Sequence, residues 1–298
     1  MNWRKLLGSR SIVTGALGAT FIFFFCPFLA GHAQSAAKGS LEQRGDSMKV
    51  VDAVAYFGPA EFGDDTVIKV RLSPQPLDHQ AVERAIDVAG ELTRQQQDTG
   101  GHADLDFTND GVWRGSSYSL SGGYGCGYCS ADSPAAQKTK MKFEAGRLRG
   151  SIQIKSSDYP KKDGLGVTLT LDVPVLTLTG TSPLPKNGGD PAEVLLACQA
   201  AVKKRDKAAV RRLCFAADDA QMKLAEYVTD EGFWLVALSK RTGVKLGGTK
   251  ISGGRTKGDQ AELFVEGTCD GQAYKGSVYL RKSAAGWKYD HEQLKMVF

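Results

Sequence analysis

The chain has 298 residues, of which 38 are Lys or Arg and 33 are Asp or Glu, and its formal net charge is +5. Residues 1–33 contain three of the basic groups and no acidic group, so the rest of the chain carries +2. So small a charge gives no strongly basic face, and we therefore expect no nucleic-acid partner.

Residues 1–33 have the three-part layout of a bacterial signal peptide. Basic residues precede an apolar run from Ile12 to Ala30, and small residues precede Gln34. We expect cleavage that leaves a mature chain beginning between Gln34 and Lys38, in the periplasm or secreted. The alternative is an uncleaved anchor, because 19 apolar residues are long enough to cross a bilayer. The membrane would then be a partner through this segment only.

Residues 45–180 predict a β-rich domain with one helix on one face. Period-two alternation of apolar and polar residues indicates the strands, and Asp110-Gly111 indicates a hairpin between two of them. The expected strands are 49–57, 66–72, 103–107, 112–120, 147–155 and 167–175. Asp78 is a candidate N-cap for the helix, whose apolar positions recur at helical spacing from Val82 to Leu92. We expect His79, in the first turn, to be exposed.

His102, Asp104 and Asp106 alternate along one expected strand, so their side chains project from one face and form a candidate cation site. The apolar residues between them explain the same pattern as an amphipathic strand whose polar side faces solvent. We take this second interpretation and expect no metal and no other cofactor.

A segment rich in Pro, Gly and Ser at 181–189 is the expected linker to a second domain, 190–298. Asp190 and Pro191 indicate a helix start, with Asp190 as the cap. Two more helices are expected at 206–214 and 219–239. The expected strands are 249–255, 260–268, 272–281 and 286–296. Helices packed on one face of an antiparallel sheet form an α+β layer, so the expected fold class of the whole chain is α+β.

The sequence from Asp190 to Phe215, with GDQAEL at 258–263, KGSVYL at 275–280 and GWKY at 286–289, resembles small exported members of the nuclear-transport-factor-2-like superfamily. The resemblance implies an α+β cone, with helices on a curved antiparallel sheet and room for a pocket. That superfamily includes enzymes, ligand-binding modules and assembly domains, so the resemblance implies no single activity.

Five cysteines follow residue 33, and in an oxidising compartment they predict disulfides with one thiol left over. Cys126 and Cys129 form a CxxC pair in a glycine-rich segment, where we expect a loop disulfide; thiol-disulfide exchange is the alternative. Cys198 and Cys214 lie on consecutive expected helices, and we favour a bond between them. Cys269 is a competing partner, so the three pairings remain open.

A cavity in the cone would be lined by aromatic residues of the third helix and the sheet, together with His291. The candidates are Tyr227, Trp234, Tyr274 and Tyr289. The same residues would equally fill a closed core.

No assembled catalytic signature is visible in the sequence, so we name no catalytic residue and expect a non-enzymatic module that binds a protein or small ligand. The alternative is a hydrolase- or isomerase-type enzyme that uses the cone cavity. In it, His291 would face a pocket alongside Tyr289 and meet a carboxylate such as Asp230 or Glu231.

Overall fold

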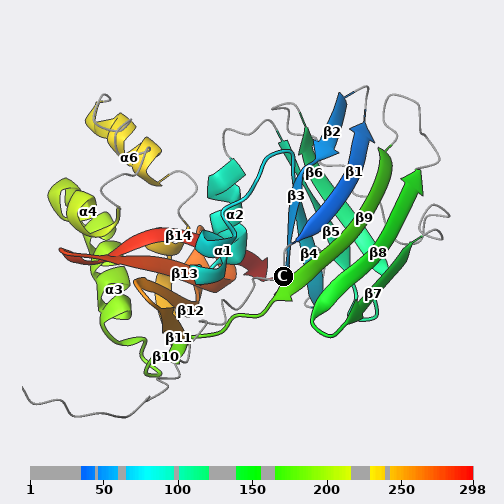
Figure 1. Cartoon of the computed structure of the whole chain (residues 1–298). Coiled ribbons are helices and arrows are strands. Elements are labelled where there is room, and N and C mark those ends of the chain that lie inside the picture. Colours follow the sequence, from blue (N-terminus) through cyan, green and yellow to red (C-terminus); the bar gives the residue numbers. More distant parts are fainter. Residues whose placement is uncertain are drawn as a thin grey trace, which may run out of the picture. The chain divides into compact units, whose positions relative to one another are not determined.

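The computed structural model describes residues 35–43, 46–59, 65–96, 101–120, 139–155, 165–215, 229–238 and 242–297. The segment 1–33, Cys126, Cys129 and Tyr227 lie outside these ranges, so the predictions made on them stay predictions. The described chain is a mixed α+β protein built mostly of strands, which confirms the predicted fold class (Figure 1).

The described residues before 177 form a nine-stranded sheet, called the first sheet below. Its main order is β2-β1-β9-β3-β4-β5-β6, and β8 continues from β9 to β7. All its pairs are antiparallel except β3 with β9. The sheet is curved and nearly closed, because β2 approaches β6. The strands are β1 (Ala36–Gln43), β2 (Asp46–Val50), β3 (Asp52–Pro59), β4 (Thr66–Ser73), β5 (Gly101–Phe107), β6 (Trp113–Leu120), β7 (Lys140–Glu144), β8 (Arg147–Lys155) and β9 (Leu165–Leu176).

Alternation along the strands explains the core of this sheet. In β9, the odd-numbered apolar residues from Val167 to Val175 are all buried, whereas Thr168 and Thr170 of the same strand are exposed. Leu148 and Ile152 of β8 are buried as well. The predicted hairpin is confirmed: β5 pairs with β6, and Gly111 in the turn has a φ of 84°, which favours glycine.

The single strand predicted at 49–57 is wrong, because the structure has two. β2 pairs with β1, whereas β3 pairs with β4 and β9, and Val51 between them lies outside both ladders. The chain changes partners at this residue. An alternation pattern shows which residues are buried but not which neighbour each strand pairs with, so it runs through the break.

The single helix predicted after Asp78 is also two helices, α1 (His79–Arg84) and α2 (Val88–Gln96). Asp78 does cap the first, since its carboxylate accepts a hydrogen bond from the Ala81 amide at 2.9 Å. Ala85 then adopts an extended conformation. Asp87 begins the second helix by accepting from the Gly90 amide at 3.0 Å. Both helices cover one face of the first sheet over a small apolar cluster that includes Val54, Tyr56, Val82 and Leu92.

The described residues after 180 form a five-stranded antiparallel sheet of order β10-β11-β12-β13-β14, the second sheet. Part of the predicted linker belongs to it, because Ser182 and Pro183 pair with Thr256 and Arg255. The strands are β10 (Ser182–Pro183), β11 (Gly247–Lys257), β12 (Gln260–Cys269), β13 (Gln272–Ser283) and β14 (Gly286–Val297). The four longer strands match the predicted ones to within about three residues.

Helices α3 (Gly189–Lys203) and α4 (Lys207–Leu213) pack against one face of the second sheet (Figure 1). The described helical segments that follow them are α6 (Asp230–Leu238) and a short 3-10 turn, η2 (Gly243–Lys245). The apolar core lies between helices and sheet and includes Leu195, Val210, Phe233, Leu263 and Tyr289.

The cap predicted for α3 is wrong. The helix begins two residues earlier, Gly188 is the N-cap in a left-handed conformation (φ 79°), and the cap makes no side-chain hydrogen bond. A Cβ on Gly188 would lie 2.7 Å from the Cβ of Ala192, so the tight packing at this end favours glycine. Pro191 is still tolerated, because amides in the first turn have no partner within the helix.

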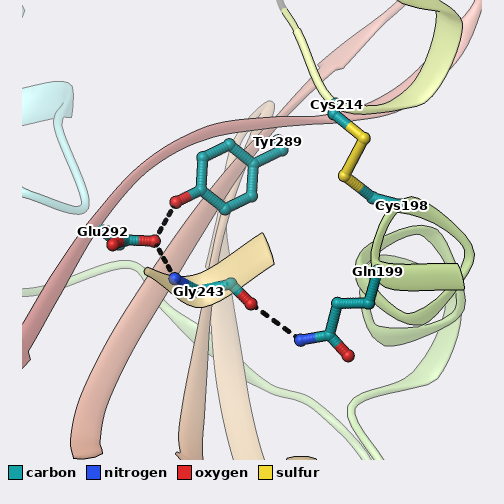
Figure 2. The surroundings of a disulfide bond; sticks show 6 residues. All are labelled: Cys198, Gln199, Cys214, Gly243, Tyr289 and Glu292. Atoms are coloured by element: carbon teal, nitrogen blue, oxygen red, sulfur yellow. Dashed lines mark hydrogen bonds between the residues drawn. A yellow bond between two sulfur atoms is a disulfide. The ribbon is translucent and has the colours of Figure 1, made fainter. Parts of the chain in front are cut away.

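Cys198 of α3 and Cys214 at the end of α4 form a disulfide, which confirms the favoured pairing (Figure 2). Cys269 is a free thiol and is buried at the end of β12. Closing a loop of this length contributes about 3 kcal/mol in the chain-entropy model.

Candidate functional site

A β-bulge in β14 decides where the two candidate residues of that strand lie. Tyr289 is paired with Leu280, and His291 is paired with Tyr279, so Asp290 is the extra residue. Leu280 and Tyr279 are consecutive in β13 and therefore face opposite sides of the sheet. Tyr289 and His291 consequently lie on opposite faces, and the expectation that both face one pocket is wrong.

Tyr289 is fully buried on the helix-covered face. Its hydroxyl hydrogen-bonds Glu292, which also accepts from the amide of Gly243 in η2 (Figure 2). Gln199 of α3 in turn donates to the Gly243 carbonyl at 2.7 Å. A Cβ on Gly243 would lie 2.5 Å from the Glu292 carboxylate, so the network requires glycine here. This chain of contacts ties the sheet to α3 beside the disulfide.

Trp234 and Tyr274 are partly buried and pack against the same core as Tyr289. Trp234 contacts Phe233 edge to face, with ring centroids 5.1 Å apart. Asp230 is exposed and pairs with Lys207 at 2.5 Å rather than with His291. The described aromatic candidates are thus arranged as residues that fill a core.

The face of the second sheet that carries His291 borders a cleft of about 1020 Å³, at the upper end of the usual range for ligand sites. Its floor consists of side chains from β11 to β14. Its opposite wall consists of the end of β3, the turn between α1 and α2, and the segment after β9. The polar and charged floor residues are Ser252, Arg255, Glu262, Glu266, Lys275, Ser277, Tyr279, Gln293 and Lys295.

Hydrogen bonds join the wall to the floor, between the α1–α2 turn and strands β11 and β12. The Ile86 amide donates to the Gln260 side chain at 2.9 Å, and Lys257 donates to the carbonyls of Glu83 and Ala85. These contacts are made where the two helices separate. They lie at the break, which the apolar spacing of the sequence does not show.

His291 lies between two carboxylates, next to the cleft-lining residues Asp87 and Tyr279. Its Nε2 contacts Asp87, its Nδ1 lies 3.1 Å from Asp290, and its ring stacks on Tyr279 with centroids 4.5 Å apart. A neutral imidazole has one N–H and can donate to only one carboxylate, so this arrangement selects the imidazolium. Burial alone lowers the pKa of His291, but the hydrogen bonds and charges of Asp290 and Asp87 outweigh it and raise the pKa to about 9.

The close approach of His291 to α2 requires a glycine. A Cβ on Gly90 would lie 2.4 Å from the Asp87 carboxylate and 2.9 Å from Nε2 of His291. Asp87 is itself buried, and it also accepts a hydrogen bond from Gln293 at 2.9 Å. The turn between α1 and α2 is therefore held to β14 by the ion pair of Asp87 with His291 and by the hydrogen bond from Gln293.

Glu262 is a second buried carboxylate on the cleft floor. Arg255 binds it at 2.5 Å, Ser277 donates to it at 2.7 Å, and the Tyr279 hydroxyl donates at 3.3 Å. Burial raises the pKa of the Tyr279 phenol. The carboxylate to which Ser277 donates is already paired with Arg255, which makes it a weaker base for activating Ser277 as a nucleophile.

The two aspartates of the candidate cation site on β5 do not face solvent as predicted but lie in ion pairs. Asp104 pairs with Arg71, and Asp106 accepts from Lys69 at 3.0 Å; Asp106 and Arg71 are buried. Gln96 of α2 accepts from Arg71, so the pair of Arg71 with Asp104 lies beneath α2. No group of residues in the described ranges has the arrangement of a metal site.

His79 is half-exposed rather than fully exposed, and it lies 2.9 Å from Asp52. The hydrogen bond with Asp52 raises the pKa of His79. This pair anchors the start of α1 to the start of β3 and does not reach the cleft.

Sequence reasoning placed His291 on the last strand but missed Asp87 and Glu262. The position of Asp87 ahead of Val88 and Gly90 is an N-cap signal for a second helix, so its local role was detectable. Its partner, 204 residues away, was not.

No family model, no curated protein and no solved structure matches this chain at a significant level. Within the described ranges, no helix combines the length and apolar character needed to cross a bilayer.

Proposed function

We propose that the chain is an exported, non-enzymatic binding module of the bacterial envelope, and that the cleft is its ligand site. The observation that carries the proposal is how the acid–base groups in and beside the cleft are bound. His291 is held by two carboxylates, and Glu262 is held by Arg255, Ser277 and Tyr279. Groups whose hydrogen bonds and charges are already paired within the protein can shape a binding surface. A general base, by contrast, needs a free lone pair directed at its substrate.

The proposed architecture is a β-rich domain, predicted at 45–180 and extended to residue 36 by β1, followed by a nuclear-transport-factor-2-like domain at 190–298. Two facts support this division: the strands fall into two sheets, and α3 and α4 cover one face of the second. A disulfide between Cys198 and Cys214 is consistent with an extracytoplasmic location, and the basic and apolar layout of residues 1–33 supports export.

Intact mass of the protein from its native envelope, before and after reduction and thiol labelling, tests the export part of the proposal. We expect a chain that begins between Gln34 and Lys38. A full-length mass would show an anchored protein, and rapid reduction of Cys126 and Cys129 would favour thiol exchange.

Binding of the uncharged dye phenylnaphthylamine, whose fluorescence rises in apolar surroundings, tests the cleft. Ala89 lines its wall, so Ala89→Trp fills space in the cleft and is expected to weaken binding. Leu196→Trp adds the same ring at an exposed position of α3 and serves as the control. Equal binding by wild type and both variants would refute the cleft as the site. Turnover in a broad hydrolase panel that His291→Gln abolishes would refute the non-enzymatic assignment.

A further inference from the structure

The charges that line the cleft are unevenly compensated. Each of its acidic side chains has a partner: Asp87 has His291 and Gln293, Glu262 has Arg255, and Glu266 has Lys250 at 3.3 Å. Arg255 is likewise paired. Lys275 and Lys295, among the described residues, form no ion pair. The lining itself has as many acidic as basic side chains, but Asp87 and Glu266 are paired with His291 and Lys250 from outside it. The charge without an ion-pair partner is therefore positive and comes from these two lysines.

Lys275 and Lys295 are also direct cross-strand neighbours in the register of β13 and β14. Both are exposed, and both line the cleft. Like charges directly opposite one another in a sheet are destabilising. Glu266 lies directly opposite Lys275 on β12 and offsets part of this repulsion, but it is also paired with Lys250. A bound anion between Lys275 and Lys295 would relieve the repulsion that remains, so the two lysines provide a local reason for the site to prefer negative charge.

The rest of the cleft offers apolar surface. The wall contributes Pro59, Val88, Leu176 and Leu178, and two aromatic side chains, Phe57 and Phe264, lie on its two sides. Phe57 is 36% exposed and Phe264 is 38% exposed, which is high for rings of this size. A ligand that covered both rings would remove apolar area from water.

We propose that the cleft binds amphipathic anions: an apolar chain or ring lies between Phe57 and Phe264, and its carboxylate, sulfonate or phosphate lies between Lys275 and Lys295. This inference rests on the proposed function and adds the chemical class of the ligand. The source of such a ligand is either a free amphiphile or the headgroup region of an anionic lipid.

Two dyes that share an aromatic body separate charge from apolar contact. Anilinonaphthalene sulfonate carries a negative charge, and phenylnaphthylamine does not. The double variant Lys275→Gln/Lys295→Gln is expected to bind the anionic dye about tenfold more weakly and the neutral dye equally well. Lys203→Gln/Lys204→Gln, which removes two exposed charges at the end of α3, is the matched control and is expected to leave both affinities unchanged. The preference for the anionic dye should also fall as salt is added.

Competition by monomeric dodecanoate, and sedimentation with phosphatidylglycerol vesicles compared with phosphatidylcholine vesicles, distinguish the two sources. Dependence on Lys275 and Lys295 in either assay supports the inference and identifies the source. If both dyes bind in the cleft and the double variant changes neither affinity, the inference is wrong and the proposed function stands. If Ala89→Trp also changes neither, both are wrong.

Discussion

Replacing His291 with glutamine tests whether a protonated histidine clamps the α1–α2 turn to β14. Glutamine retains hydrogen-bonding capacity but removes the positive charge that faces Asp87 and Asp290. In the unfolded chain the pKa of a histidine is about 6.5. The folded value is raised to about 9. A folded pKa above the unfolded one adds stability that is fully present below the unfolded pKa and is lost as the pH rises through the folded pKa.

The magnitude follows from the size of this shift, since each pKa unit corresponds to about 1.4 kcal/mol, which gives roughly 3 kcal/mol in total. Solvent reduces this figure, because the His291 side chain is 30% exposed. We therefore expect wild type to exceed His291→Gln by about 2 kcal/mol near pH 6 and by well under 1 kcal/mol near pH 9.5.

Urea unfolding followed by tryptophan fluorescence, at several pH values across this range, measures the difference. Tyr279, which stacks on His291, stays protonated across this range in both proteins, because burial raises the pKa of its phenol. His79→Gln is the comparison, because His79 pairs with Asp52 in a more exposed place and should show a smaller trend of the same sign. A difference between wild type and His291→Gln that is constant or grows with pH would refute the imidazolium clamp.

Two further predictions concern stability. Gly90→Ala would ordinarily stabilise a helix by up to about 1 kcal/mol, but here the new Cβ meets Asp87 and His291, so we expect a lower free energy of unfolding; a raised value would contradict the packing of α2 against β14. Cys198→Ala/Cys214→Ala should lower the free energy of unfolding by about 3 kcal/mol, measured in urea, and reductant should then have a smaller effect on the variant than on the wild type.

Local patterns predicted the elements whose partners are near in sequence. The Asp110-Gly111 hairpin, the cap at Asp78 and the four long strands of the second sheet lie where alternation and turn residues placed them. In each case, the deciding interactions span few residues, or depend only on which side of a strand is buried. The Cys198–Cys214 bond was favoured for a related reason, since sixteen residues on consecutive helices keep the two sulfurs close.

The candidate site depended on contacts that no local pattern contains. Apolar spacing runs without interruption from Val82 to Leu92. Asp87 is a local signal for a second helix, but the contact made at the break joins Ile86 to Gln260, 174 residues away. The predicted pocket assumed that the last strand is regular, so that Tyr289 and His291 lie on the same face.

What the sequence by itself determined is therefore the α+β class, most of the strands and helices, and the residue types available for chemistry. The tertiary structure decided which face each of them occupies. One extra residue at Asp290 is enough, because side chains alternate with a period of two and a single insertion moves His291 from the core side to the cleft side. The bulge at Asp290 exists only relative to the pairing with β13, so the alternation of residue types along β14 does not reveal it.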